Sequence, residues 1–117
     1  MHEMSIAAQV IDTAEKHVPA DSKTRLLRVN LILGKLSGVS TEALTTCFEA
    51  LVRGTPSEGA TLSITEVPIF AKCSECGEKS EQEDLPFICA SCGSLCNEIV
   101  SGRELQIDSI EVEDDSR

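Results

Sequence analysis

Four of the six cysteines form two matching motifs, CSECG at 73–77 and CASCG at 89–93. Two residues between cysteines let one tight turn direct both thiolates at one point, and the following glycine tolerates the positive φ that such a turn often needs. Twelve residues separate the pairs, fewer than the roughly 15 to 20 common in this pattern, but a short ribbon spans that gap. The spacing predicts a structural zinc site, because four thiolates leave no position for substrate water. Its ligands are Cys73, Cys76, Cys89 and Cys92.

Two other interpretations of these cysteines are a thioredoxin-like dithiol and unrelated core thiols. The repetition of the CxxCG pattern argues against both. Cys47 falls on the apolar face of a predicted helix and is interpreted as a small core residue. For Cys96 an ordinary packed or exposed thiol is favoured over one that replaces a neighbouring zinc ligand when redox state or pH changes.

The first three residues, MHE, offer ligands for a different metal. The amine of Met1 has an ordinary pKa of about 8, and the imidazole of His2 follows one residue later. With the intervening amide deprotonated, these nitrogens form planar chelate rings that suit Ni(II) or Cu(II) better than Zn(II). The alternative is a solvated chain end. Glu3 is a further ligand or an acid that the helix dipole favours in a first turn, whereas for His17 capping or packing is favoured over metal binding.

The elements that position these residues follow from apolar periodicity. Residues 3–18 predict an amphipathic helix, and a second helix begins after Ser40 as N-cap and closes at Arg53 and Gly54. Residues 25–36 alternate as a half-buried strand. Its buried side is predicted to carry Leu27, Val29, Leu31 and Leu33. A second strand over 61–69 bends near Pro68, and a third runs from Leu105 to Val112.

These elements predict an α+β fold with two helices on a three-stranded mixed sheet and an inserted zinc-ribbon-like module. We expect an α/β domain over 1–69 plus 102–117, which contains MHE, and a zinc-binding module over 70–101. The module has few apolar side chains, so its folding is expected to depend on zinc. Departure of the second strand from the sheet and return of the last would also permit exchange of segments between two copies, as a homodimer.

Composition excludes several classes of protein. The 117 residues carry a net charge of -10, which repels nucleic acid and anionic lipid. In the module, Phe70 and Phe87 are the only aromatic side chains available for base stacking. No apolar run approaches the roughly 20 residues of a membrane span, and the amino terminus does not resemble a signal peptide. We expect a cytoplasmic protein, in which reduced cysteines serve metal or redox chemistry.

Two further classes of function are weighed against a role in metal binding alone. The sequence has no nucleophile elbow, phosphate loop or His-Glu zinc signature, so we expect no enzyme. A structural adaptor that uses the zinc module only for docking is the other class. It would bind its partner without dependence on nickel.

Several segments together resemble the HypA/HybF family of nickel-incorporation proteins for [NiFe]-hydrogenase maturation. They are MHE at the start, GKLSGVSTEAL, FEALVRGTPSEGATLSI, the two CxxCG pairs, CGSL and VSGRELQIDSIEVE. The resemblance extends over essentially the whole chain. It is far more specific than a zinc ribbon alone, which many unrelated proteins carry.

The resemblance implies that His2 is the essential nickel ligand, with the amine of Met1 and the backbone or side chain of Glu3 beside it. It implies that the α/β domain over 1–69 plus 102–117 is a nickel-binding domain and that the four cysteines hold a structural zinc. The expected partners are the GTPase HypB, which takes part in nickel delivery, and the precursor of the [NiFe]-hydrogenase large subunit. Some members of the family also supply urease.

Overall fold

The computed structural model describes residues 3–19 and 24–114. Contacts divide the chain into two compact units. The helical unit comprises Met1–Ile32, Gly38–Thr65 and Gln106–Arg117, and the cysteine unit comprises Leu33–Ser37 and Glu66–Leu105. Neither helix within the described ranges has the length and apolar content required to cross a membrane.

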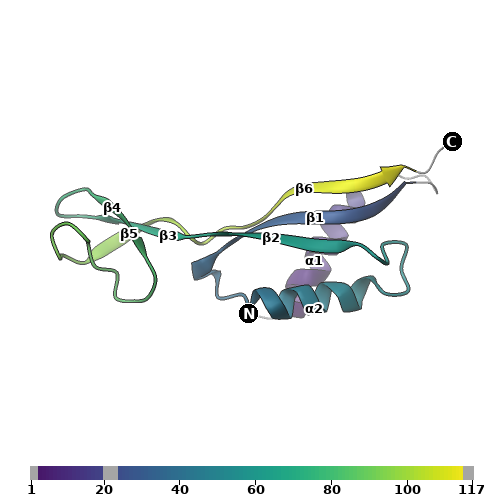
Figure 1. Ribbon diagram of the computed structural model, residues 1–117, viewed down its shortest axis with the longest axis horizontal. Helices are drawn as coiled ribbons and strands as arrows, with labels where there is room; N and C mark the ends of the chain where they lie inside the picture. The colour runs from purple at the N-terminus through teal and green to yellow at the C-terminus, as the bar shows by residue number, and fades with distance from the viewer. Residues whose placement is uncertain (1–2, 20–23, 115–117) are drawn as a thin grey trace. The chain divides into compact units, whose positions relative to one another are not determined.

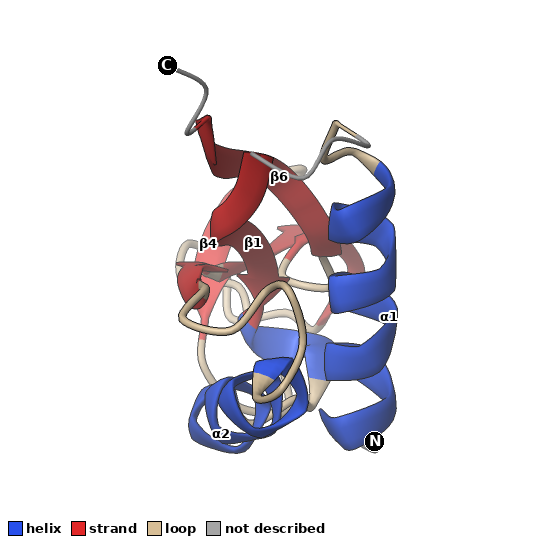
Figure 2. Ribbon diagram, turned by 90° about the vertical axis from the view of Figure 1, so that its right-hand side faces the viewer, coloured by secondary structure: helices blue, strands red, loops and turns tan. Residues whose placement is uncertain are grey.

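Two helices of the helical unit share one core with its sheet. Helix α1 spans Glu3–Lys16 and α2 spans Thr41–Val52, close to the predicted bounds. The Ser40 hydroxyl accepts a hydrogen bond from the Ala43 N–H at 3.2 Å, which confirms Ser40 as the N-cap of α2. Figure 2 shows α1 from the side and α2 nearly end-on, so their axes cross steeply. The helices bury Ile6, Ala7, Val10, Ala14, Leu44, Phe48 and Val52.

The sheet of the helical unit has the strand order β2-β1-β6. Its strands are β1 (Thr24–Gly34), β2 (Thr61–Val67) and β6 (Leu105–Asp114). Arg25 pairs with Glu113 at 2.8 Å and Asn30 with Ser109 at 3.0 Å, so numbers rise along β1 as they fall along β6 and the two strands are antiparallel. Figure 1 shows β1 and β2 running in the same direction. The sheet is therefore mixed, as predicted.

One predicted core position of β1 is wrong. Leu27 is 38% exposed, whereas its neighbour Leu26 is 3% exposed. Because Leu26 and Val29 are both buried although three residues apart, the strand changes phase between them and does not follow the regular alternation of a strand. The predictions for Val29, Leu31 and Leu33 are confirmed.

The cysteine unit contains a second sheet with the order β4-β3-β5, and both pairings are antiparallel. Its strands are β3 (Ile69–Cys73), β4 (Lys79–Gln82) and β5 (Cys96–Ser101). Pro68 separates β2 from β3, so the predicted strand over 61–69 is interrupted at this residue. The buried cluster is small, and half its members are cysteines: Ile69, Ala71, Cys73, Phe87, Cys89 and Cys96.

The end of β1 and the short 3-10 helix η1 (Lys35–Ser37) pack within the cysteine unit, although the sequence placed residues 33–37 in the first domain. The N–H of Gly34 donates to the Glu104 carbonyl at 2.7 Å, and the N–H of Leu36 donates to the Gly102 carbonyl at 2.7 Å. A Cβ on Gly34 would lie 2.0 Å from the Gly102 oxygen. Only glycine allows this approach of the two backbone segments. The predicted roles of the two domains remain predictions.

Candidate metal centre

The two CxxCG motifs form turns with the same hydrogen-bond pattern. In the first turn, the Cys73 N–H donates to the Glu78 carbonyl at 2.9 Å and the Gly77 N–H donates back to the Cys73 carbonyl at 2.9 Å. In the second, the Cys89 N–H donates to Ser94 at 2.7 Å and the Gly93 N–H donates to Cys89 at 3.0 Å. Gly77 has φ 75° and Gly93 has φ 78°. Both values lie in the left-handed region, so the predicted reason for the two glycines is confirmed.

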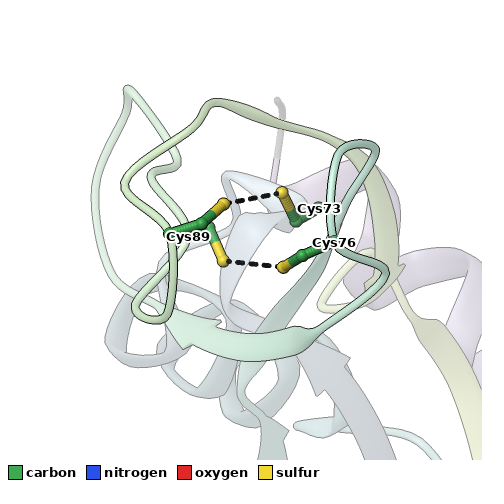
Figure 3. A group of neighbouring side chains, drawn as sticks. Cys73, Cys76 and Cys89 are labelled. Atoms are coloured by element: carbon green, nitrogen blue, oxygen red, sulfur yellow. Dashed lines mark hydrogen bonds between the residues drawn. The ribbon is translucent and has the colours of Figure 1, made fainter.

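These turns bring the four predicted zinc ligands together. The sulfur atoms of Cys73, Cys76, Cys89 and Cys92 all lie within 4.8 Å of one another. The Cys73 and Cys92 sulfurs are 3.5 Å apart, and those of Cys76 and Cys89 are 3.6 Å apart. Figure 3 shows the sulfurs of Cys73, Cys76 and Cys89 turned toward one another from facing loops.

The geometry of this cage fits zinc. With Zn–S bonds of about 2.3 Å, a tetrahedron requires sulfurs about 3.8 Å apart. The separations in the cage are close to that value. All four ligands would be sulfur, which suits zinc or an iron–sulfur group and not magnesium or calcium. Four thiolates complete a tetrahedral shell, so the cage is suited to a structural ion and leaves no position for a substrate.

The cage has a buried and an exposed side. Cys73 and Cys89 are 0% and 3% exposed, whereas Cys76 and Cys92 are exposed to solvent. Cys73 ends β3 and Cys89 follows the isolated bridge residue Ile88, and both belong to the small apolar cluster. The second cysteine of each pair lies at the tip of its turn. An oxidant or competing ligand in solution would therefore reach Cys76 and Cys92 first.

The acidities of the four thiols differ with their hydrogen bonds. The hydroxyl and then the backbone N–H of Ser94 hold the pKa of Cys92 at about 6. The backbone of Glu78 favours ionisation of Cys76, but the bond to the Cys89 sulfur, burial and the other thiols outweigh it and raise its pKa to about 12. Backbone N–H groups of Cys92 and Ser91 lower the pKa of Cys89. The folded cage therefore favours a thiolate at Cys92 even at neutral pH, and Ser94 is a contributor that the sequence analysis did not identify.

The two remaining cysteines occupy different environments. Cys47 is half-buried and packs against the core of the helical unit, which confirms its interpretation as a core residue. Cys96 is 7% exposed and faces Cys73 across β3 and β5. Burial, followed by the charges of Cys73 and Cys89, raises the pKa of the Cys96 thiol. Sequence spacing gives no sign of this proximity, because it depends on the register of the two strands.

The predicted nickel site falls mostly outside the described residues, since Met1 and His2 are not among them. Glu3 begins α1, and its carboxylate accepts a hydrogen bond from the Ser40 N–H at 3.0 Å. This contact joins the first residue of α1 to the N-cap of α2. The two residues are 37 positions apart, so no local pattern predicts it.

His17 has the capping role that was favoured over metal binding. Its side chain is exposed, and its Nδ1 donates to the Thr13 carbonyl at 2.9 Å in the last turn of α1. Over residues 3–19 and 24–114, the four-cysteine cage is the cluster of side chains suited to a metal.

Comparison with known proteins shows similarity over almost the full chain. A family model described as hydrogenase/urease nickel incorporation, metallochaperone, HypA matches residues 1–112. The hydrogenase maturation factor HypA of Desulfatibacillum aliphaticivorans is 43% identical over 117 residues, covering 97% of this chain and 88% of the relative. The protein of the same name from Chlorobium phaeobacteroides (strain BS1) is 42% identical over 113 residues, covering 97% of this chain and 100% of the relative.

Solved structures share the fold. The solution structure of the Ni metallochaperone HypA from Helicobacter pylori superposes with a TM-score of 0.61 at 23% identity, covering 95% of this chain and 97% of that chain. A second solution structure, of a HypA protein, gives a TM-score of 0.66 at 24% identity and covers 95% of each chain. With a family model that covers nearly all of the sequence and relatives above 40% identity, this chain belongs to the HypA family of hydrogenase/urease nickel-incorporation metallochaperones.

Proposed function

We propose that this protein is a cytoplasmic nickel metallochaperone for [NiFe]-hydrogenase, with Ni(II) as cargo at Met1, His2 and Glu3 and structural Zn(II) in the cysteine cage. The assignment of zinc and nickel to separate sites, here called the division of roles, rests on one observation. The four sulfurs lie close enough to fill a tetrahedral shell together. A cargo ion that must enter and leave therefore needs other ligands, and MHE provides nitrogen ligands of the type that Ni(II) accepts.

The contact between Glu3 and Ser40 supports a role for Glu3 in this site. The hydrogen bond holds the beginning of α1 to the beginning of α2. Met1 and His2 directly precede this anchored residue in the sequence. A backbone ligand from Glu3 would leave the bond between its carboxylate and the Ser40 N–H intact, so we assign Glu3 a backbone ligand and an anchoring carboxylate.

Delivery follows from the chemistry of a site at a chain end. Few protein ligands surround the ion, so a partner's ligands can enter the open positions before the imidazole of His2 dissociates. Copper binds the same nitrogens more tightly than nickel. Selectivity therefore depends on metal availability and on the partners, which we propose are the GTPase HypB and the precursor of the hydrogenase large subunit. The names of the relatives favour hydrogenase over urease as the enzyme served.

Metal stoichiometry of untagged protein with its native amino terminus tests this proposal. Wild type, His2→Ala and His17→Ala would be loaded with nickel and zinc and measured by elemental analysis. We expect one zinc per chain in all three, and nickel in wild type and His17→Ala only. His17→Ala is the matched control, because it removes the other histidine, which hydrogen-bonds Thr13. Nickel retained by His2→Ala, or zinc lost together with nickel, would contradict the division of roles.

The role of Glu3 is tested separately. Glu3→Gln keeps an oxygen that can accept the Ser40 N–H, whereas Glu3→Ala removes the acceptor. We expect Glu3→Gln to retain nickel binding and Glu3→Ala to weaken it. If both variants lose nickel equally, the carboxylate is itself a ligand and the backbone assignment is wrong.

The delivery step requires a measurement with partners. Wild type or His2→Ala is incubated with nickel, freed of unbound metal and mixed with the GTPase, GTP and the purified large-subunit precursor, and nickel in the re-isolated precursor is measured. We expect transfer from wild type alone. Equal nickel in the precursor with either chaperone would show that the ion does not pass through His2.

A further inference from the structure

Cys96 gives the cysteine unit a fifth thiol beside the cage. It begins β5, is 7% exposed, and belongs to the same buried cluster as Cys73, Cys89 and Phe87. Its sulfur is not among the four that lie within 4.8 Å of one another. Cys96 is therefore a neighbour of the cage on its buried side and not a member of the present ligand set.

The strand register directs the Cys96 side chain to the same face as Cys73. The two residues are direct partners in the antiparallel pairing of β3 with β5. The Cys73 N–H donates to Glu78, and the Cys96 N–H donates to Phe87 at 2.8 Å, so neither donates across the pair. In a pair without mutual hydrogen bonds, the two backbones approach most closely and the side chains lie next to each other. Cys73, Cys89 and Cys96 also belong to one buried cluster, so the Cys96 side chain lies on the buried side of the cage.

The exposure of the ligands determines which of them dissociates first. Cys76 and Cys92 are exposed at the tips of their turns, while Cys73 and Cys89 are buried. Zinc has no geometric preference from d electrons, so exchange of one thiolate for another needs no change of coordination type. Cys96 is the buried thiol of this cluster that is not already in the ligand set.

We propose that Cys96 is a reserve zinc ligand, whose sulfur binds the ion when Cys76 or Cys92 dissociates or is modified. In the exchange, one zinc–sulfur bond breaks at the exposed cysteine and one forms at Cys96. The proton of the Cys96 thiol passes to the departing thiolate, and no electrons are transferred. The zinc remains bound by four thiolates while an exposed thiol is released to solvent. The inference rests on the proposal that the cage holds zinc.

The test compares single and double variants of the full-length protein. Cys76→Ser and Cys92→Ser each remove an exposed ligand, and each is combined with Cys96→Ser. Cobalt-substituted protein reports the number of bound thiolates through the intensity of its sulfur-to-cobalt absorption, and chelator competition reports zinc affinity. Combination with Cys47→Ser is the matched control, because Cys47 packs against the core of the helical unit.

We expect Cys76→Ser and Cys92→Ser to retain four-thiolate absorption, and the doubles with Cys96→Ser to show three thiolates. Loss of groups that only support a metal ligand costs about 10- to 100-fold in affinity, so loss of the replacement thiolate should weaken zinc binding by at least about tenfold. The doubles with Cys47→Ser should match the singles. Identical absorption and affinity with and without Cys96 would overturn the inference. Wild type without zinc would instead contradict the zinc site itself.

Discussion

Different interactions stabilise the helical unit and the cysteine unit internally. The helical unit buries large apolar side chains from both helices and the central strand, including Leu31, Leu44 and Phe48 at 0–1% exposure. In the cysteine unit, half the buried cluster consists of cysteines. Its Leu85 and Leu95 are 75% and 63% exposed, so they add nothing to a core. The comparison indicates that a metal takes the place of a hydrophobic core in the smaller unit.

Of the predicted changes, removal of zinc should produce the largest difference in stability between the two units. Structural zinc sites in small modules contribute about 10–16 kcal/mol of apparent binding free energy, which is also folding free energy. A strong chelator should therefore abolish amide exchange protection in β3, β4 and β5 and leave α1, α2 and β1 protected. Hydrogen exchange read by NMR or mass spectrometry measures this. Retained protection in the cysteine unit without metal would show that its apolar cluster suffices.

The number of protons taken up at pH 7 on zinc release tests whether the cysteine unit unfolds without its metal. In an unfolded chain, thiols have a pKa of about 8.5, so release of zinc with unfolding should take up about four protons. If the metal-free cage kept its structure, Cys92 with a pKa of about 6 would stay ionised, and the lowered pKa of Cys89 acts in the same direction, so the uptake would be smaller than four. We expect about four.

The sign of the pH dependence follows from this uptake. Zinc affinity should rise with pH, and at about four protons per ion the loss on acidification is ~5 kcal/mol per pH unit near neutrality. Zinc titrations in buffers of different ionisation enthalpy give the proton number. An uptake clearly below four would show that the cage forms before the metal binds.

Truncation in the apolar core should affect the helical unit alone. Phe48→Ala removes a fully buried aromatic ring from α2 and should lower the free energy of unfolding by about 3–5 kcal/mol. Chemical denaturation of the helical signal measures the loss, with zinc content as control. Phe87→Ala in the cysteine unit should instead lower zinc affinity. If Phe48→Ala also displaced zinc, the two units would not be energetically separate.

Sequence reasoning identifies features in this chain that depend on local spacing. The cage forms as predicted because each CxxCG turn is built from consecutive residues, and its glycine has the positive φ that the turn requires. The apolar period of α1 and the N-cap at Ser40 are local in the same sense, and both are confirmed.

Features that depend on tertiary packing were not predicted. The contact between Glu3 and Ser40 and the pairing of Cys96 with Cys73 join residues far apart in the chain. Leu27 was placed on the wrong side of β1 because Leu26 and Leu27 are both apolar, so the sequence does not show where the buried face changes phase. The boundary at 33–37 likewise depends on two backbone hydrogen bonds from Gly34 and Leu36, which composition does not reveal.

The smallest predicted effect is a loss of stability in the helical unit that leaves nickel binding at the proposed site unchanged. Ser40→Ala removes the hydroxyl that accepts the Ala43 N–H, and loss of such a cap costs about 1 kcal/mol. The backbone N–H of residue 40 remains, so its bond to Glu3 survives the substitution. We therefore expect denaturation to show the stability loss while nickel and zinc stoichiometries stay at wild-type values. If Ser40→Ala lost nickel, the hydroxyl itself would take part in the nickel site, and the cap would link the fold of the helical unit directly to its cargo.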